Sequence, residues 1–177
     1  MLIAGNLLRP PSRLNGLTAG LSAIPDGKPG TLATLKLMRE LVRQGKKTLP
    51  IRSLAVELVR GNAQKDWLGE VRSIQEFVRD RIRYVKDVVD VETLQTPDKT
   101  LLIGSGDCDD KSVLAASLLE AIGHPTRFVA VSFDGLEYVH VYPETLVGRA
   151  WLSVETTEPV SVGWQPSGVV ERMVVHN

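Results

Sequence analysis

The spacing of the apolar residues changes once along this chain of 177 residues. Between residues 31 and 122, apolar side chains recur every three or four positions, which is the spacing of one face of a helix. From residue 127 onward they alternate with polar residues, which is the spacing of a half-buried strand. A chain that places its helices first and its strands afterwards does not form repeated strand–helix–strand units. The pattern therefore predicts the α+β class, with helices packed on an antiparallel sheet.

Glycine and proline divide the helical part into four predicted helices, at residues 31–45, 51–61, 66–81 and 107–122. Residues 87–106 are expected to form a connector, in which Thr96-Pro97-Asp98 indicates a turn or a helix start. Residues 1–30 are rich in proline, glycine and asparagine and are expected to form an extended arm. We expect residues 1–65 to comprise this arm and the first helices, and residues 66–177 to form the core of a single compact unit.

Three strands are predicted at residues 127–133, 137–142 and 150–155. Asp134-Gly135 between the first two is typical of a hairpin turn. Residues 169–175 are a candidate for a last strand. Short connections of this kind favour antiparallel neighbours.

Composition excludes some classes of partner. Lys plus Arg and Asp plus Glu both number 21, so there is no basic surplus with which to bind nucleic acid. No apolar run has the length of a membrane span, and the first residues do not resemble a signal peptide. A single cysteine cannot form an intrachain disulfide. We therefore expect a cytoplasmic protein of unknown oligomeric state.

The single cysteine, Cys108, follows Gly104-Ser105-Gly106 at the start of a predicted helix. Free backbone N–H groups and the helix dipole favour a thiolate there, and the same N–H groups can stabilise an oxyanion. The flanking residues Asp107, Asp109 and Asp110 act in the opposite direction and should raise the thiol pKa. The dipole is worth about 0.3–1 kcal/mol, whereas one pKa unit corresponds to about 1.4 kcal/mol. A protonated histidine would have to supply most of the stabilisation of a thiolate.

His140 is the candidate partner of Cys108, and Glu155 is the candidate that orients its ring. Alternation places His140 on one face of its strand with Tyr138 and Tyr142. Glu155 shares a face of the next strand with Trp151 and could meet His140 if the two strands pair. Cys108, His140 and Glu155 then form a candidate triad. Each of the three alone would more often be structural, as an inert cysteine, a strand histidine or a solvated carboxylate.

Three segments in order resemble the transglutaminase-like superfamily, a group related to papain. Residues 106–129 resemble its cysteine motif, with Gly-Asp-Cys opening a helix and Ile-Gly-His-Pro-Thr-Arg leading into a strand. Residues 138–142 resemble its histidine strand, and residues 151–157 its third motif, a Trp followed by Leu-Asp-Pro-Thr. The likeness covers about residues 67–166. It implies a papain-like α+β fold with the nucleophile helix packed on the sheet.

The resemblance also implies roles for individual residues. Cys108 would attack an amide carbonyl and form a thioester, His140 would act as general base and acid, and Glu155 would orient the imidazole. The family usually has Asp where this chain has Glu155. Gln95 is a candidate oxyanion donor through its side-chain amide. Tyr138, Tyr142 and Trp151 are candidates to line the substrate groove.

The resemblance leaves several functions open. A peptide or protein substrate is implied, with no cofactor, no metal, no nucleic acid and no membrane partner. Hydrolysis by a cysteine peptidase or amidase is favoured. Transglutaminase crosslinking and a non-catalytic assembly protein are the alternatives. Residues 159–166 are similar to small phage or prophage members of the family, which suggests a bacterial or phage-infected cell.

Overall fold

The structure is a computed structural model in which residues 27–86 and 94–177 are described. The helices in these residues are α1 (Gly27–Gly45), α2 (Leu49–Val59), α3 (Trp67–Arg81), α4 (Pro97–Ile103) and α5 (Cys108–Ala121). The strands are β1 (Arg83–Tyr84), β2 (Ser105–Gly106), β3 (Thr126–Ser132), β4 (His140–Val147), β5 (Ala150–Ser153) and β6 (Glu171–His176). The predicted α+β class, with helices before an antiparallel sheet, is confirmed.

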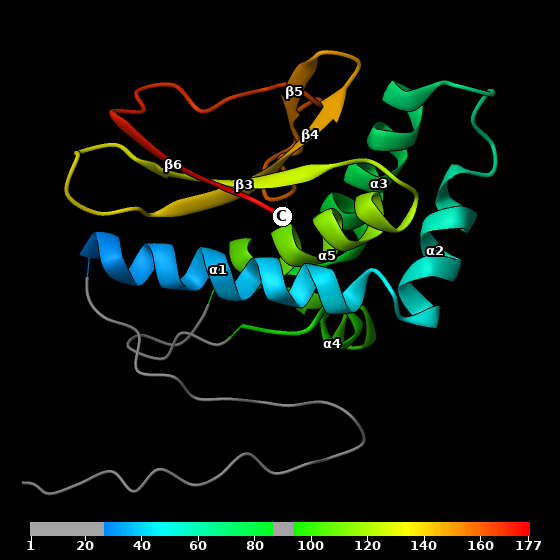
Figure 1. The fold of residues 1–177 in the computed structure, drawn as a ribbon, viewed down its shortest axis with the longest axis horizontal. Coiled ribbons are helices and arrows are strands. Elements are labelled where there is room, and N and C mark those ends of the chain that lie inside the picture. Colours follow the sequence, from blue (N-terminus) through cyan, green and yellow to red (C-terminus); the bar gives the residue numbers. More distant parts are fainter. Residues whose placement is uncertain (1–26, 87–93) are drawn as a thin grey trace, which may run out of the picture.

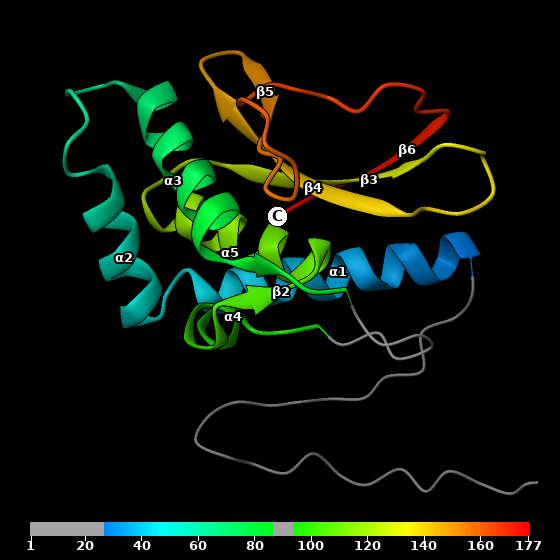
Figure 2. The same ribbon diagram turned by 180° about the vertical axis from the view of Figure 1, so that it is seen from behind.

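The four long strands form one antiparallel sheet in the order β5-β4-β3-β6. Figure 1 shows this sheet lying over a layer of helices, with α1 and α5 beneath it and α2 and α3 at one end. The short strands β1 and β2 pair in parallel, outside the main sheet. Figure 2, seen from behind, shows β2 and α4 below α5, on the side away from the sheet. Helix α5 is therefore the central element, with neighbours above, below and at its end.

Two apolar clusters explain why the helices pack in this way. One joins α2 and α3 to α5 through buried side chains such as Ile51, Ile74 and Leu118. The other joins α1 and α5 to the sheet through Met38 and Phe128, among others. Helix α5 contributes to both clusters, and its residues from Asp110 to Leu119 are all buried. The expected division of the chain at residue 66 stays a prediction. Both α1 and α2 pack with α5 in these clusters.

The element boundaries differ from the predicted ones in several places. Helix α1 begins at Gly27, within the segment expected to be an extended arm; residues 1–26 lie outside the described residues. Within the expected connector, Thr96 accepts a hydrogen bond from the Lys99 N–H and starts the short helix α4. The histidine strand begins only at His140, three residues later than predicted. The candidate last strand exists as β6 and pairs with β3.

None of the helices in the described residues is long and apolar enough to cross a membrane.

Candidate active site

Helix α5 begins with Cys108, and its N-cap is Asp107. The Asp107 carboxylate accepts hydrogen bonds from the backbone N–H groups of Asp109 and Asp110, at 3.0 and 3.1 Å. Before the cap, Gly106 packs so closely that a Cβ there would lie 2.5 Å from the Asp110 Cβ. Only glycine fits this approach, since both atoms would be fixed to the backbone. The predicted position of Cys108 in the first turn of a helix is confirmed.

Two side chains one turn apart on α5, Cys108 and Ser112, form hydrogen bonds with the backbone of Val141 in β4. The Ser112 hydroxyl donates to the Val141 carbonyl at 3.2 Å, and the Val141 N–H donates to the Cys108 sulfur. Residues four apart lie on the same face of a helix, so both contacts come from one stripe of α5. Val141 directly follows His140, so these two hydrogen bonds hold the thiol beside the start of the histidine strand.

His140 and Glu155 form a short polar pair, as expected, although Glu155 lies just beyond the end of β5 and not within a strand. The His140 Nε2 and the Glu155 Oε2 lie 2.6 Å apart. The other oxygen, Oε1, accepts from the Thr157 N–H at 2.6 Å and the Thr157 hydroxyl at 2.7 Å. Burial of Glu155 acts to raise its pKa, but the hydrogen bonds and charge of His140 and the Thr157 bonds outweigh burial, so that pKa lies below its usual range.

The low pKa of the Glu155 carboxyl settles the proton on the ring. An ionised carboxylate only accepts hydrogen bonds, so Nε2 of His140 carries the proton and donates it. In neutral imidazole the other nitrogen, Nδ1, is then an acceptor. An acceptor nitrogen held by a buried carboxylate is what a general base needs in order to take a thiol proton.

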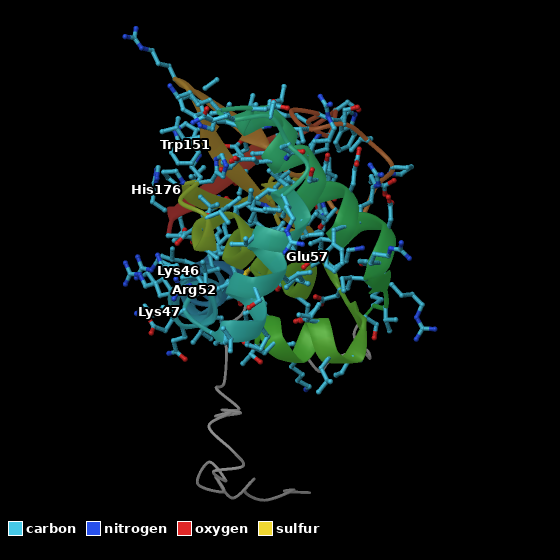
Figure 3. The ribbon with its side chains drawn as sticks, turned by 90° about the vertical axis from the view of Figure 1, so that its right-hand side faces the viewer. Lys46, Lys47, Arg52, Glu57, Trp151 and His176 are labelled. Carbon is cyan, nitrogen blue, oxygen red and sulfur yellow. The ribbon has the colours of Figure 1, made fainter. Side chains whose placement is uncertain are left out.

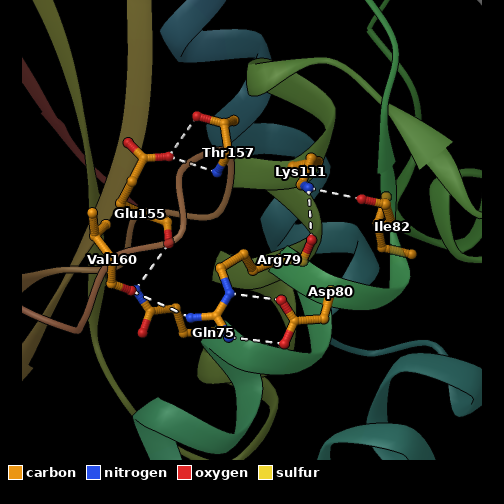
Figure 4. A network of polar contacts seen from close by, with 8 residues as sticks. All are labelled: Gln75, Arg79, Asp80, Ile82, Lys111, Glu155, Thr157 and Val160. Carbon is orange, nitrogen blue, oxygen red and sulfur yellow. Dashed lines mark hydrogen bonds and ion pairs between the residues drawn. The ribbon is translucent and has the colours of Figure 1, made fainter.

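The backbone around Glu155 is fixed by helix α3, as Figure 4 shows. The buried side-chain amide of Gln75 donates to the carbonyls of Glu155 at 2.9 Å and Val160 at 3.3 Å. In the same region, Lys111 of α5 is buried and donates to the carbonyls of Ile82 and Arg79 at the end of α3. Neither Gln75 nor Lys111 was among the site residues predicted from the sequence. Each is a polar side chain on an otherwise apolar face of its helix, and this is the sequence feature that could have pointed to them.

The Cys108 thiol does not meet the His140 ring in this structure. No hydrogen bond joins the sulfur to either ring nitrogen; the thiol instead donates to the Asp109 carboxylate at 3.4 Å. Burial raises the pKa of the Cys108 thiol, and the charges of Asp109 and Asp107 raise it further. The expectation that the flanking carboxylates oppose ionisation agrees with this direction. The resting form is therefore a neutral thiol beside a preformed His–Glu pair.

Asp109→Asn is expected to speed alkylation of Cys108 by iodoacetamide at pH 7 by about three- to tenfold, because removing the carboxylate lowers the thiol pKa and raises the thiolate fraction. The measurement is the alkylation rate across pH, followed by intact mass. The whole rate curve should move to lower pH. Glu57→Gln, an exposed change on α2 (Figure 3), is the matched control and should leave the curve in place. Superimposable curves for Asp109→Asn and the native chain would contradict the role given to Asp109.

Gln95 is engaged elsewhere and is not positioned as the predicted oxyanion donor. Its side-chain Nε2 donates to Asp110 Oδ2 at 2.6 Å and to the Ser105 carbonyl at 3.4 Å, which uses both amide hydrogens. Its backbone N–H donates to Asp110 Oδ1 at 2.7 Å. Gln95 therefore holds the first turn of α5 in place. In the described residues, the Cys108 backbone N–H and the turn around it are the remaining candidates for an oxyanion site.

Two of the three predicted groove residues do not offer a surface to a substrate, although the Tyr142 ring lies beside the His140 ring, with centroids 6.0 Å apart. Tyr142 is 1% exposed and packs with Val129 and Val131 in a separate cluster. Tyr138 precedes β4, so the strand alternation does not reach it, and it packs on the α1 side of the sheet. Neither side chain is available to a substrate in the way we expected.

Trp151, the third predicted groove residue, lies on the edge strand β5, away from the space beside His140. Its ring meets the His176 ring edge-on, with centroids 5.4 Å apart, and the Arg127 guanidinium lies 4.3 Å from the Trp151 centroid. Figure 3 shows Trp151 and His176 next to one another. Arg127 is in turn paired with Glu144. Trp151 therefore stabilises the sheet rather than lining the space beside His140.

A pocket of about 470 Å³ opens beside His140. It is lined by Tyr84, Phe133, His140, Glu158, Val160 and Trp164. Thr157, which holds Glu155, and Pro166 complete its wall. These residues come from β1, the end of β3, the start of β4 and the segment after Glu155. The periodicity of the sequence could not predict these residues as pocket walls, because most of them lie outside helices and strands.

One group of possible metal ligands occurs in the described residues. Atoms of Asp107, Cys108 and Asp109 lie within 4.8 Å of one another. The N-cap bonds of Asp107 and the thiol bond of Asp109 account for this closeness. The expectation that the protein needs no metal stays a prediction.

The fold and the site's residues together indicate the class of protein to which the chain belongs. Cys108 starts the central helix α5 and faces an antiparallel sheet in which β4 begins with His140 and the segment after β5 contains Glu155. The sequence pattern of the transglutaminase-like superfamily matches residues 52–156, which contain Cys108, His140 and Glu155. The chain belongs to the transglutaminase-like superfamily.

Solved structures agree with this fold at low sequence identity. One is a putative cysteine protease from Cytophaga hutchinsonii, with a TM-score of 0.51 and 16% identity over 72% of this chain. Another is a putative protease from Parabacteroides distasonis ATCC 8503, with a TM-score of 0.62 and 14% identity over 81% of this chain. The chain spans 46% of the first protein and 29% of the second. No curated protein sequence matches the chain.

Proposed function

We propose that this protein is a cysteine peptidase or amidase that cleaves an amide bond of a peptide or protein through a thioester on Cys108. The observation that carries the proposal is the 2.6 Å pair of His140 with a buried, ionised Glu155, next to Val141, whose N–H faces the Cys108 sulfur. A base hydrogen-bonded to its orienting acid therefore lies near the nucleophile at one end of β4.

The chemistry starts from a neutral thiol, because burial and two carboxylates oppose the thiolate. Nδ1 of His140 would take the thiol proton as the sulfur attacks the amide carbonyl, and Glu155 would stabilise the imidazolium. The same proton would then go to the leaving amine as the C–N bond breaks. Water would finally attack the thioester carbonyl while His140 accepts its proton; as the C–S bond breaks, the acid is released and the proton returns from His140 to the sulfur. The sulfur has to turn from Asp109 toward the ring before the first step.

Transfer of the acyl group to an amine is the second candidate, since an amine can replace water at the thioester. It is supported by the open pocket that touches His140, the residue that would accept the proton of an attacking amine. A non-catalytic assembly role, the third alternative, is less well supported because the chain retains a cysteine, a histidine and an acid in competent positions. A cytoplasmic location and a phage or prophage origin stay predictions.

The test uses an activated ester, benzyloxycarbonyl-glycine p-nitrophenyl ester, which forms a thioester without needing peptide recognition. We expect a burst of one equivalent of nitrophenolate and a matching mass increase on Cys108. The assignment is unambiguous because the chain has one cysteine. Cys108→Ala should show no burst. A folded native chain that gives no burst and no acyl adduct would overturn the proposal.

A further inference from the structure

The pocket beside His140 has a composition that indicates what it binds. Three aromatic side chains, Tyr84, Phe133 and Trp164, line it together with the aliphatic Val160. Phe133 is 42% and Trp164 is 38% exposed, so their rings are accessible in this structure. Glu158 is the one carboxylate among the lining residues, and no lysine or arginine lines the pocket. Aromatic faces with a single carboxylate suit a long side chain whose stem is apolar and whose end is positively charged.

The wall of this pocket is fixed before any ligand enters. The Gly163 N–H donates to the Ser153 carbonyl at 2.8 Å, and the Ser153 hydroxyl donates to the Trp164 carbonyl. The Val160 carbonyl accepts from Gln75 and from Arg79, at 3.3 and 3.4 Å. These bonds tie the segment after Glu155 to β5 and α3. A preformed wall of this kind lowers the entropic cost of binding.

The position of the pocket indicates which part of a substrate it receives. His140 lines the pocket, whereas Cys108 does not. In the proposed reaction, the imidazole gives a proton to the leaving amine, so the amine side of the scissile bond must lie next to His140. The acyl side must lie on Cys108. A pocket that touches His140 alone is therefore on the amine side.

We infer that this pocket is the binding site for the residue on the amine side of the scissile bond, and that it favours a lysine or arginine side chain. The inference rests on the proposed function. The stem of such a residue would pack on Trp164 and Phe133, and its cationic end would lie near Glu158. An acidic side chain would be repelled by Glu158.

The experiment measures how a preformed thioester divides between water and added amines. The nitrophenyl ester loads Cys108, and an amino-acid amide then competes with water. Its amine attacks the thioester carbonyl, the C–N bond forms as the C–S bond breaks, and the amine proton passes through His140 to the sulfur. The acceptors are the amides of arginine, citrulline, norleucine, glutamate and glycine. Citrulline has nearly the shape of arginine without its charge.

We expect arginine amide to outcompete citrulline amide by about three- to tenfold, the range of an accessible cation–π contact combined with an exposed ion pair. Glutamate amide should be the poorest acceptor with a side chain. Glu158→Gln should remove the advantage of arginine over citrulline. Trp164→Ala should reduce the reaction of the thioester with arginine amide and with norleucine amide to a similar extent. Trp67→Ala, which changes an exposed tryptophan outside the pocket, should leave both reactions unchanged.

The outcomes separate the pocket from the chemistry. A normal burst with equal use of arginine and citrulline amides, unaffected by Glu158→Gln, would overturn the cationic preference. A normal burst with no dependence on the acceptor side chain or on Trp164 would overturn the amine-side site altogether. A folded chain without a burst would instead overturn the proposed function, and the inference with it.

Discussion

Replacing His140 by alanine is expected to slow acylation of Cys108 by about 10²–10⁴-fold, the usual contribution of a positioned general base. The thiol is neutral at rest because burial and the charges of Asp109 and Asp107 raise its pKa. Without an imidazole, the acceptor that remains at the thiol is the Asp109 carboxylate, a much weaker base than imidazole. The measurement is the rate of the nitrophenolate burst at pH 7.

Two further variants make this result specific. Glu155→Gln should slow the burst less than His140→Ala does, because the ring remains but loses its ionised partner. His176→Ala is the matched control, since the His176 ring contacts Trp151 and not the site. It should leave the burst unchanged. Equal losses for His140→Ala and His176→Ala would indicate a general effect on the fold and contradict a role for His140 as base.

Replacing Asp110 by alanine is expected to lower the free energy of unfolding by about 2–4 kcal/mol, because hydrogen bonds to charged groups contribute about 1.5–3 kcal/mol each and do not add fully. Asp110 is fully buried and accepts from the Gln95 backbone N–H and its side-chain amide. Its loss would leave both Gln95 donors without this acceptor. The measurement is urea-induced unfolding followed by circular dichroism.

The neighbouring carboxylate provides the comparison. Asp109 is partly exposed, so Asp109→Ala should cost less than about 1 kcal/mol, as surface substitutions usually do, while it speeds alkylation of Cys108. The two adjacent aspartates would then have different roles: Asp110 stabilises the start of α5, and Asp109 keeps the thiol protonated. Similar losses of stability for both variants would contradict this division.

The fold class and the helix-start position of Cys108 could be predicted because each left a local pattern, whereas the triad itself stays a prediction. The helical spacing before residue 122, the alternation after it, and the glycine-rich start of the cysteine helix are all short-range features. The proximity of His140 and Glu155 was expected from strand alternation, but Glu155 lies two residues beyond the end of β5 and reaches His140 from the segment that follows it. The beginning of β4 could not be predicted in this way, because residues that precede a strand carry the same alternation as those within it. Tyr138 was placed on the wrong face for that reason.

The pocket and the partner of Gln95 could not be predicted, since both depend on contacts between distant segments. Gln95 and Asp110 are joined across the turn that includes β2. The pocket walls Tyr84, Phe133 and Trp164 come from three separate parts of the chain. Amide side chains near a candidate cysteine look equally suited to an oxyanion and to a carboxylate when only the sequence is considered. Burial of Asp110 decides between them here.

Because α5 is hydrogen-bonded to Val141, the distance between the Cys108 sulfur and the His140 ring depends on how the helix packs against the sheet. Cys108 and Ser112 hold the backbone next to His140 with short side chains that have little freedom to compensate. A change of volume under the sheet, for example Phe128→Ala, would shift α5 against β4 and so alter the thiol's reach. The acylation rate would then report on the packing beneath the sheet, because a change of volume there moves Cys108 relative to His140.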